Sequence, residues 1–220
     1  MASKKILIIS HKPPYPKIDG GSIAIAQVLE RILEQGHNVT FLCIETDKHP
    51  AQNSISNTKL NFKAIYINTN IKIASAFSNI FTKQSYILSR FNKNVFRSEL
   101  KKILKKQTFD TILFESLFTS AYLDTVNELS NAKKIYRAHN IEHHIWFEQS
   151  NQNSNIFIKW YLKMQTKRLK NEEIKFWNTI DCILSISETD RSHITKQCPT
   201  PTHTLGLHIE KKYLQYNDQS

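Results

Sequence analysis

Short apolar runs alternate with helix-like segments along most of the chain, and this alternation restricts the fold more than any other feature. The runs are rich in β-branched residues, as in KILIIS at 5–10, which is typical of buried strands. Runs of this kind span 5–10, 39–44, 62–67, 111–114, 134–137, 183–186 and 202–205. The intervening apolar residues often recur at helical spacing. The pattern predicts an α/β fold with a parallel sheet of about six or seven strands and helices on both faces.

A glycine pair, Gly20-Gly21, lies between the first predicted strand and the first predicted helix, in a chain with only 4 glycines. Glycine lets a ligand approach the main chain, and the N–H groups at a helix N-terminus attract anions such as phosphate. The loop is neither a Walker A motif nor a G-x-G-x-x-G fingerprint. We predict that Gly20 and Gly21 contact a phosphate; the alternative is a helix entry that merely requires small residues.

The charge balance is strongly basic, with 30 Lys and Arg against 19 Asp and Glu and a formal net charge of +11. Such a surplus favours anionic partners: nucleic acid, an anionic membrane surface or phosphorylated small molecules. No apolar run approaches the ~20 residues that span a bilayer, and the N-terminus enters a strand without a secretory signal. We therefore expect a cytoplasmic protein. The 3 cysteines match no metal or redox spacing, so we expect ordinary core residues.

Polar residues follow the predicted strands where those strands end. The carboxyl ends of parallel strands meet at one edge of a sheet, and ligands bind in the crevice outside that edge. The residues at these positions are Glu115, Ser116, His139, Asn140, Glu142 and Ser187. We predict that they face a ligand cleft, although Ser187 with Asp190 also resembles the capping box that opens a helix.

The histidines at 139, 143 and 144 raise the question of a metal site. His139 and His143 would share one face of a helix, but Glu142 precedes His143 directly, so the H-E-x-x-H order is absent. A zinc site also needs a further ligand, to which nothing in the sequence points. We therefore predict no metal, and His139 is either a polar group for a ligand or a structural histidine.

A long predicted helix, 155–177, carries two different surfaces. Ile158, Leu162, Leu169 and Phe176 form one apolar side, and the lysines at 159, 163, 167 and 170 form a basic stripe. A stripe of this kind is either a solvated face or a contact with an anionic membrane surface.

Several segments, taken together, resemble a known enzyme family. Residues 13–21 (PPYPKIDGG), the segment RAHNIE at 137–142, the junction IDCILSISE at 180–188 and Leu205-Gly206-Leu207 followed by Tyr213 occur in this order. They are similar to the N-terminal half of GT-B glycosyltransferases of the group 1, or family 4, type. The resemblance covers nearly the whole chain and implies a Rossmann-like domain at 1–208, with 209–220 beginning the interdomain crossing or forming a frayed tail.

The resemblance implies an enzyme that transfers a sugar from a nucleotide-sugar to a cell-envelope or polysaccharide acceptor, with retention, no metal and no cofactor beyond its substrate. It places the donor phosphates at Gly20 and Gly21 and His139 near the donor sugar as a catalytic residue. Asp19, Glu115, Ser116, Asn140, Glu142 and Ser187 are the weaker cleft contacts. The C-terminal donor-binding domain is absent from the chain, so we expect these 220 residues alone to transfer no sugar. We also expect location at the inner face of the cell membrane.

Two other functions stay open from the residues alone. The first is a basic nucleic-acid-binding module, but no reader motif is present and the lysines are spread over several helices, so no nucleic acid is expected. The second is an α/β domain that binds another nucleotide or metabolite.

Overall fold

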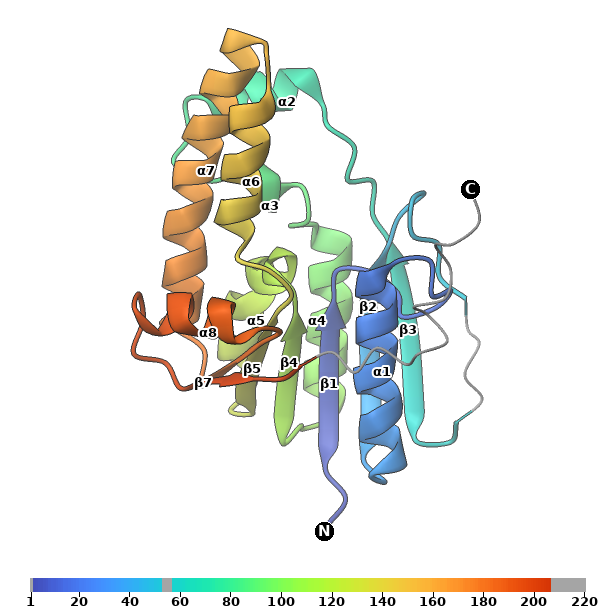
Figure 1. The fold of residues 1–220 in the computed structure, drawn as a ribbon. Helices are drawn as coiled ribbons and strands as arrows, with labels where there is room; N and C mark the ends of the chain where they lie inside the picture. Colours follow the sequence, from blue (N-terminus) through green and yellow to red (C-terminus); the bar gives the residue numbers. More distant parts are fainter. Residues whose placement is uncertain (1, 53–56, 207–220) are drawn as a thin grey trace, which may run out of the picture.

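The computed structural model describes residues 2–52 and 57–206, which form a parallel seven-stranded sheet of order β3-β2-β1-β4-β5-β6-β7 (Figure 1). The strands are β1 (Lys5–Ser10), β2 (Asn38–Glu45), β3 (Leu60–Tyr66), β4 (Thr111–Glu115), β5 (Lys133–Ala138), β6 (Cys182–Ser185) and β7 (Thr202–Thr204). The predicted α/β fold and its parallel sheet are confirmed. The proposed crossing at 209–220, and Leu207 and Tyr213 of the resemblance, lie outside the described residues.

Helices connect most of the strands, and the long helix predicted at 155–177 is confirmed. They are α1 (Gly20–Glu34), α2 (Ile73–Asn79), α3 (Tyr86–Ser89), α4 (Asn94–Lys106), the 3-10 helix η1 (Leu117–Tyr122), α5 (Leu123–Leu129), α6 (Glu142–Gln152), α7 (Ile156–Trp177) and α8 (Glu188–Thr195). The sequence pattern does not predict α6. Its three consecutive apolar residues, 145–147, form no single apolar face, and its stability comes from packing against α7.

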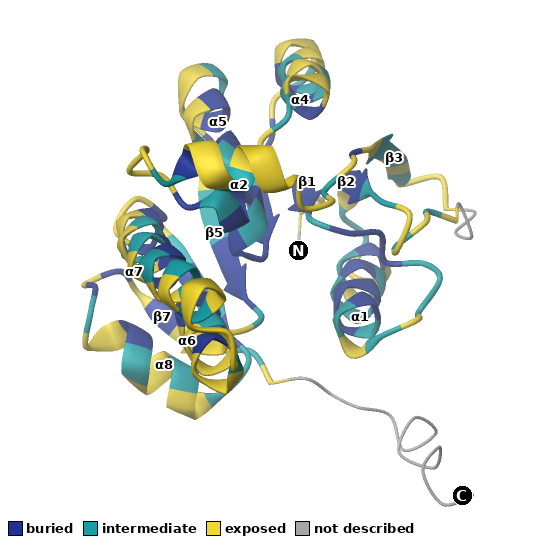
Figure 2. Ribbon diagram, turned by 90° about the horizontal axis from the view of Figure 1, so that it is seen from above, coloured by how far each residue is buried: buried dark blue, intermediate teal, exposed yellow. Residues whose placement is uncertain are grey.

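The two faces of the sheet are covered unequally. Leu7, Ile112 and Tyr136 belong to a large core to which α4, α5, α7 and α8 contribute buried side chains. Ile6, Ile8 and Leu113 point to the other face, where α1 packs over β1 and β2 (Figure 2). This alternation follows from the two-residue period of a strand.

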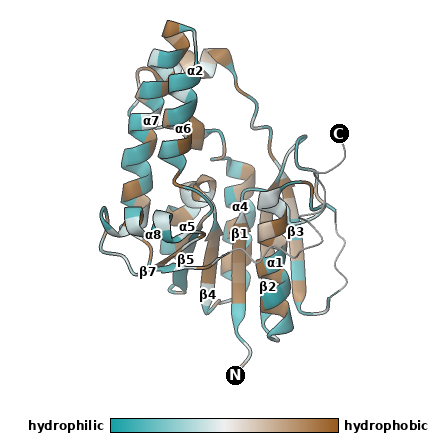
Figure 3. Ribbon diagram, in the orientation of Figure 1, coloured by the Kyte–Doolittle hydropathy of each residue, from teal (hydrophilic) through white to brown (hydrophobic). Residues whose placement is uncertain are grey.

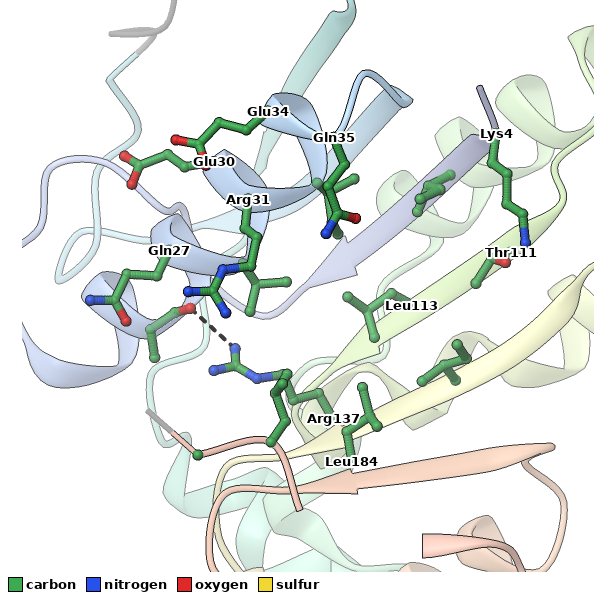
Figure 4. Close-up of a pocket in the computed structure, with 17 residues that line it drawn as sticks. Lys4, Gln27, Glu30, Arg31, Glu34, Gln35, Thr111, Leu113, Arg137 and Leu184 are labelled. Carbon is green, nitrogen blue, oxygen red and sulfur yellow. Dashed lines mark hydrogen bonds between the residues drawn. The ribbon is translucent and has the colours of Figure 1, made fainter. Parts of the chain in front are cut away.

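A cavity of about 470 Å³ lies on the α1 side of the sheet, beside that helix. Figure 4 shows Leu113 of β4, Arg137 of β5 and Leu184 of β6 turned toward Gln27 and Arg31 of α1. The cavity therefore lies along the thinly covered face of the sheet and reaches Arg137, which belongs to the candidate site described below.

The helices α6 and α7 form a hairpin that rises beyond the carboxyl ends of the strands (Figure 1). At its base, close to the sheet, Leu169, Phe176 and Trp177 enter the large core. Near the middle of α7, the end of α2 and the segment after it lie against the helix, where Arg168 donates to the backbone oxygens of Asn79 and Ile80 at 2.8 and 2.9 Å. The hairpin thus carries one buried end and one end that projects into solvent.

Candidate functional site

The strand order reverses between β1 and β4, which makes this pair the topological switch point of the sheet. Connections that leave neighbouring strands in opposite directions open a crevice at their carboxyl ends. His11 follows β1, Glu115 ends β4, and His139 follows β5. Glu115, Arg137, His139 and His11 lie together here, and we call these four residues the strand-end cluster.

Glu115 and Arg137 form a buried ion pair that the sheet register brings about. They are direct neighbours across β4 and β5, and Nη1 of Arg137 lies 3.1 Å from Oε2 of Glu115. Each side chain is only 1% exposed. The same Nη1 atom donates to the backbone oxygen of Ala24 in α1 at 3.3 Å (Figure 4), and Nε of Arg137 is buried without a partner among the described residues. Arg137 therefore fixes the carboxylate between the sheet and α1.

His139 is held by that same carboxylate, with Nε2 at 2.5 Å from Oε2 of Glu115. Burial would raise the pKa of Glu115, but the charge of Arg137 and the hydrogen bond from His139 outweigh it and lower the pKa to about 2. An ionised carboxylate only accepts hydrogen bonds, so Nε2 of His139 carries a proton and donates it. In the neutral ring, Nδ1 then carries no proton. It can therefore accept a hydrogen bond, or a proton, from a ligand hydroxyl.

His11 completes the cluster as a neutral side chain. Its burial, together with the charge of Lys12, lowers its pKa to about 3. Its Nδ1 lies 3.3 Å from the backbone oxygen of Glu115, and a neutral ring donates there. The ring meets that of His139 edge-on with centroids 5.9 Å apart, and Phe118 lies 5.7 Å away on another side. In the cluster, the ionised carboxylate of Glu115 therefore lies beside the imidazole rings of His139 and His11 at the crevice.

The glycine pair begins α1, with Asp19 as the capping residue. The Asp19 carboxylate accepts from the backbone N–H of Ser22 at 2.7 Å and pairs with Nζ of Lys12, also at 2.7 Å. Burial opposes its ionisation, but these bonds hold the pKa of Asp19 well below its usual range. Lys12 is itself buried, so this ion pair stiffens the entry to the helix.

The surroundings of the two glycines differ in how much room they leave for a side chain. A Cβ atom at Gly21 would lie 2.4 Å from Nζ of Lys12, whereas a Cβ at Gly20 would meet nothing within 4 Å. Gly21 therefore makes room for the lysine, which is the structural reason for a small residue. Gly20 is exposed and leaves its backbone open to a ligand, so phosphate binding at the pair stays a prediction.

The remaining predicted residues have separate surroundings. Ser116 has a φ of 76°, a strained value for a non-glycine residue, and its N–H donates to the backbone oxygen of Arg137 at 3.1 Å. Ser187 caps α8 by accepting from the N–H of Asp190 at 3.0 Å, as the capping pattern predicts. Glu142 is buried in the first turn of α6, and Asn140 is exposed just before it. Burial and the charge of Glu173 raise the pKa of Glu142 to about 8.

The fold thus joins Glu115 and His139 at the crevice, and Asp19 and Gly21 with Lys12 at the start of α1. Sequence reasoning does not single out His11, Lys12 or Arg137 as site residues. The position of His11 directly after β1 is a signal that could have identified it. The role of Arg137 depends on the register between β4 and β5, which the sequence does not reveal.

Comparisons with known proteins agree with this architecture. No family model matches the chain. A curated relative, the "Uncharacterized 44.6 kDa protein in cps region" of Klebsiella pneumoniae, is 24% identical over 204 residues, which cover 93% of this chain and 51% of the relative. The chain thus spans about half the length of this relative.

Solved structures of sugar-transferring enzymes share the fold. A sucrose-phosphate synthase from Thermosynechococcus elongatus matches with a TM-score of 0.63 and 14% identity over 95% of this chain and 49% of its own. Phytolacca americana UGT2, solved with UDP-2fluoro-glucose and pterostilbene, matches with a TM-score of 0.58 and 10% identity over 96% and 57%. The chain therefore has the Rossmann-like fold of one half of these GT-B glycosyltransferases. Within 2–52 and 57–206, no helix combines the length and apolar character needed to cross a bilayer.

Proposed function

We propose that this chain is the acceptor-side half of a glycosyltransferase, which transfers a sugar from a nucleotide-sugar to an acceptor. The observation that carries the proposal is the pairing of His139 with the ionised Glu115 at the switch point of the sheet. The fold supports it, because the chain matches about half of enzymes such as UGT2, whose structure contains UDP-2fluoro-glucose. The family 4 subtype and transfer with retention belong to the same proposal.

Each part of the site receives a role in this proposal. His139 lies near the donor sugar, where Nδ1 meets a hydroxyl while Glu115 holds the ring and offsets positive charge that develops on it. Arg137 keeps Glu115 ionised and in place. The exposed backbone at Gly20 faces the donor phosphates across the cleft, and Gly21 makes room for the Lys12–Asp19 ion pair that holds the start of α1. These roles require no metal and no cofactor beyond the nucleotide-sugar.

The acceptor that we propose is a growing cell-envelope polysaccharide or its lipid-linked precursor. The curated relative from Klebsiella pneumoniae lies in a cps region, which supports a polysaccharide acceptor. We further propose that the second wall of the cleft comes from a donor-binding domain, because the chain spans about half of its relatives. The 220 residues alone are then expected to bind ligands without turning them over.

The exposed end of the helical hairpin supports a location at the inner face of the membrane. Large apolar side chains are exposed on α2, the segment after it and the start of α7, and we call this set the hairpin tip: Ile73, Phe77, Phe81, Ile156, Phe157 and Trp160. Figure 3 shows apolar residues on α2 and on the upper end of α7. Phe157 is 80% exposed and Trp160 57%, which is unusual for such side chains in water.

Lysines neighbour these residues in the sequence, at positions 72, 83, 159 and 163. Apolar side chains with basic neighbours suit a membrane interface, where the rings enter the headgroup region and the ammonium groups meet anionic lipid. The strand-end cluster lies at the same carboxyl side of the sheet from which the hairpin rises. A lipid-linked acceptor could thus reach the cleft from the bilayer to which the tip binds.

A ligand panel tests the proposed function. Thermal unfolding of the purified chain is followed with UDP-sugars, with flavins and with nicotinamide dinucleotides, and sugar transfer is assayed in parallel. We expect stabilisation by nucleotide-sugars alone, its loss in Gly20→Ala, and its retention in the control Gly206→Ala, where a Cβ also meets nothing within 4 Å. Stabilisation by flavin or nicotinamide would contradict the proposed function, whereas turnover by the chain alone would contradict the proposed need for a second domain.

A further inference from the structure

Three histidines from two helices meet beside the base of the hairpin. His143 and His144 lie in α6, His193 lies in α8, and the nitrogen atoms that they offer are all within 4.8 Å of one another. The rings of His144 and His193 meet edge-on with centroids 4.2 Å apart, and those of His143 and His193 are 5.9 Å apart. Nitrogens bound to one tetrahedral zinc ion at about 2.0–2.1 Å lie roughly 3.4 Å apart. The ligand nitrogens, within 4.8 Å of one another, are close to that spacing.

His143 is held as metal-binding histidines commonly are. Its Nδ1 lies 2.7 Å from Oε2 of Glu173, whose side chain is 0% exposed. The other oxygen of Glu173 accepts from the backbone N–H of Glu142 at 3.0 Å, so the carboxylate cannot easily turn away. A carboxylate on one imidazole nitrogen orients the ring and makes the other nitrogen a better ligand.

The second nitrogen of His143 is a buried polar atom in need of a partner. Nε2 has no hydrogen-bond partner among the described residues, although His143 is only 4% exposed. Leaving such an atom unsatisfied costs about 1–3 kcal/mol. A metal ion between the three rings would satisfy it.

The other two rings lie at the surface of the molecule, since His144 is exposed and His193 is half-buried. Gln197 contacts Nε2 of His193 and steadies that ring. A surface hollow opens beside it, lined by Glu188, Thr189, Ser192, His193 and Lys196, and gives solvent and ions a route to the cluster.

We propose that His143, His144 and His193 bind a divalent transition-metal ion of the zinc class, with a solvent-exposed fourth position. Imidazole nitrogens suit Zn²⁺, Co²⁺ and Ni²⁺, whereas Mg²⁺ and Ca²⁺ prefer oxygen. The ion would link α6 to α8 and fix the start of α6, three residues beyond His139. This site is separate from the sugar-transfer proposal, which uses no metal.

The sequence conceals this site because its ligands come from distant parts of the chain. His143 and His144 precede His193 by about fifty residues, with α7 and β6 between them. The further ligand that the histidines of α6 lack in sequence is supplied by α8, once the sheet places the two helices together. The fold therefore changes the interpretation of these histidines.

Direct metal titration tests the proposal. The untagged chain is freed of metal with a chelator and titrated with Co²⁺, whose visible absorption reports its coordination, and then with Zn²⁺ as competitor. We expect one ion per chain with nitrogen coordination. His144→Ala and His193→Ala should each weaken binding by more than tenfold, whereas His203→Ala, an exposed histidine on β7, should leave it unchanged.

A positioning variant separates a built site from loose surface binding. Glu173→Gln keeps the shape of the side chain but removes the carboxylate charge beside His143, and it should weaken binding by about 10–100-fold. His144 is exposed and His193 half-buried, so their alanine variants should keep the native circular dichroism spectrum. Equal affinities in wild type, His144→Ala and His193→Ala, or an equal loss in His203→Ala, would overturn the proposal.

Discussion

The strand-end cluster and the hairpin tip reverse the usual distribution of side chains between core and surface. In the cluster, the charged side chains of Glu115 and Arg137 are 1% exposed and paired with each other. In the tip, Ile73 is 85% exposed and Phe157 80%. Buried charges depend on their partners within the fold, whereas exposed apolar side chains gain nothing from the fold and point to a partner outside it.

This contrast predicts that the strand-end cluster contributes to the stability of the fold and that the hairpin tip contributes to binding. Breaking the cluster should damage the folded chain itself, because a buried charge would lose its counter-ion. Changing the tip should leave folding intact and affect only what the chain binds. The predictions below run from the largest expected effect to the smallest.

Arg137→Met should cause the largest loss of stability. It leaves the Glu115 carboxylate buried beside His139 without the guanidinium, which typically costs about 3–5 kcal/mol. Urea denaturation measures the free energy of unfolding. The matched control is Lys101→Met, which removes the exposed pair with Glu128 and should cost less than about 1 kcal/mol. Equal losses in the two variants would contradict a larger contribution of the buried ion pair to stability.

Acid should weaken the fold through Glu115. Its pKa is about 2 in the fold against an ordinary value of 4.5, so its contribution is present above pH 4.5 and is lost as pH falls toward 2. The shift corresponds to about 3 kcal/mol. Urea titrations between pH 7 and pH 3 should show a shallower acid loss in Glu115→Gln than in wild type. Identical slopes would contradict this role of Glu115.

Substitution of the two glycines should affect stability differently, because Gly21 packs against Lys12 whereas Gly20 has free space around it. Gly21→Ala forces Nζ of Lys12 away from Asp19 and should destabilise the chain by about 1 kcal/mol, because a charged hydrogen bond is disturbed. Gly20→Ala meets no neighbour and should be neutral or stabilising by up to about 1 kcal/mol. Thermal unfolding of the two variants compares them. Equal destabilisation would place both glycines in the packing of the loop.

Substitutions in the hairpin tip should barely change the free energy of unfolding but should abolish membrane binding. Phe157→Ser with Trp160→Ser should change the free energy of unfolding by less than about 0.5 kcal/mol, since both side chains are exposed. Co-sedimentation with vesicles that contain anionic lipid should be lost. The control is Val95→Ser on α4, which is 57% exposed and outside the tip. Unchanged vesicle binding in the double variant would exclude the tip as the membrane contact.

The sequence predicts those parts of the molecule that depend on local pattern. The strand at 5–10, the helix after Gly20-Gly21 and the cap at Ser187 all follow from short-range periodicity and capping chemistry, and the structure contains each of them. The carboxyl-edge rule also places Glu115 and His139 correctly at one edge.

What the sequence misses depends on contacts between distant segments. The pairing of Arg137 with Glu115 requires the register of β4 and β5, and the grouping of His193 with His143 requires α8 to lie near α6. The helix α6 has no apolar period of its own and exists through its packing against α7. Such features become visible only after the sheet order is known.

The imidazole groups of the strand-end cluster provide the most direct test of the account. NMR spectra of the histidine rings can be recorded while a UDP-sugar and a lipid-linked sugar acceptor are added to the chain. We predict that the signals of His139 and His11 shift, that His203 on β7 does not respond, and that Glu115→Gln abolishes the shifts. Signals of His139 that stay fixed while rings elsewhere respond would contradict a sugar-transfer site at these strand ends.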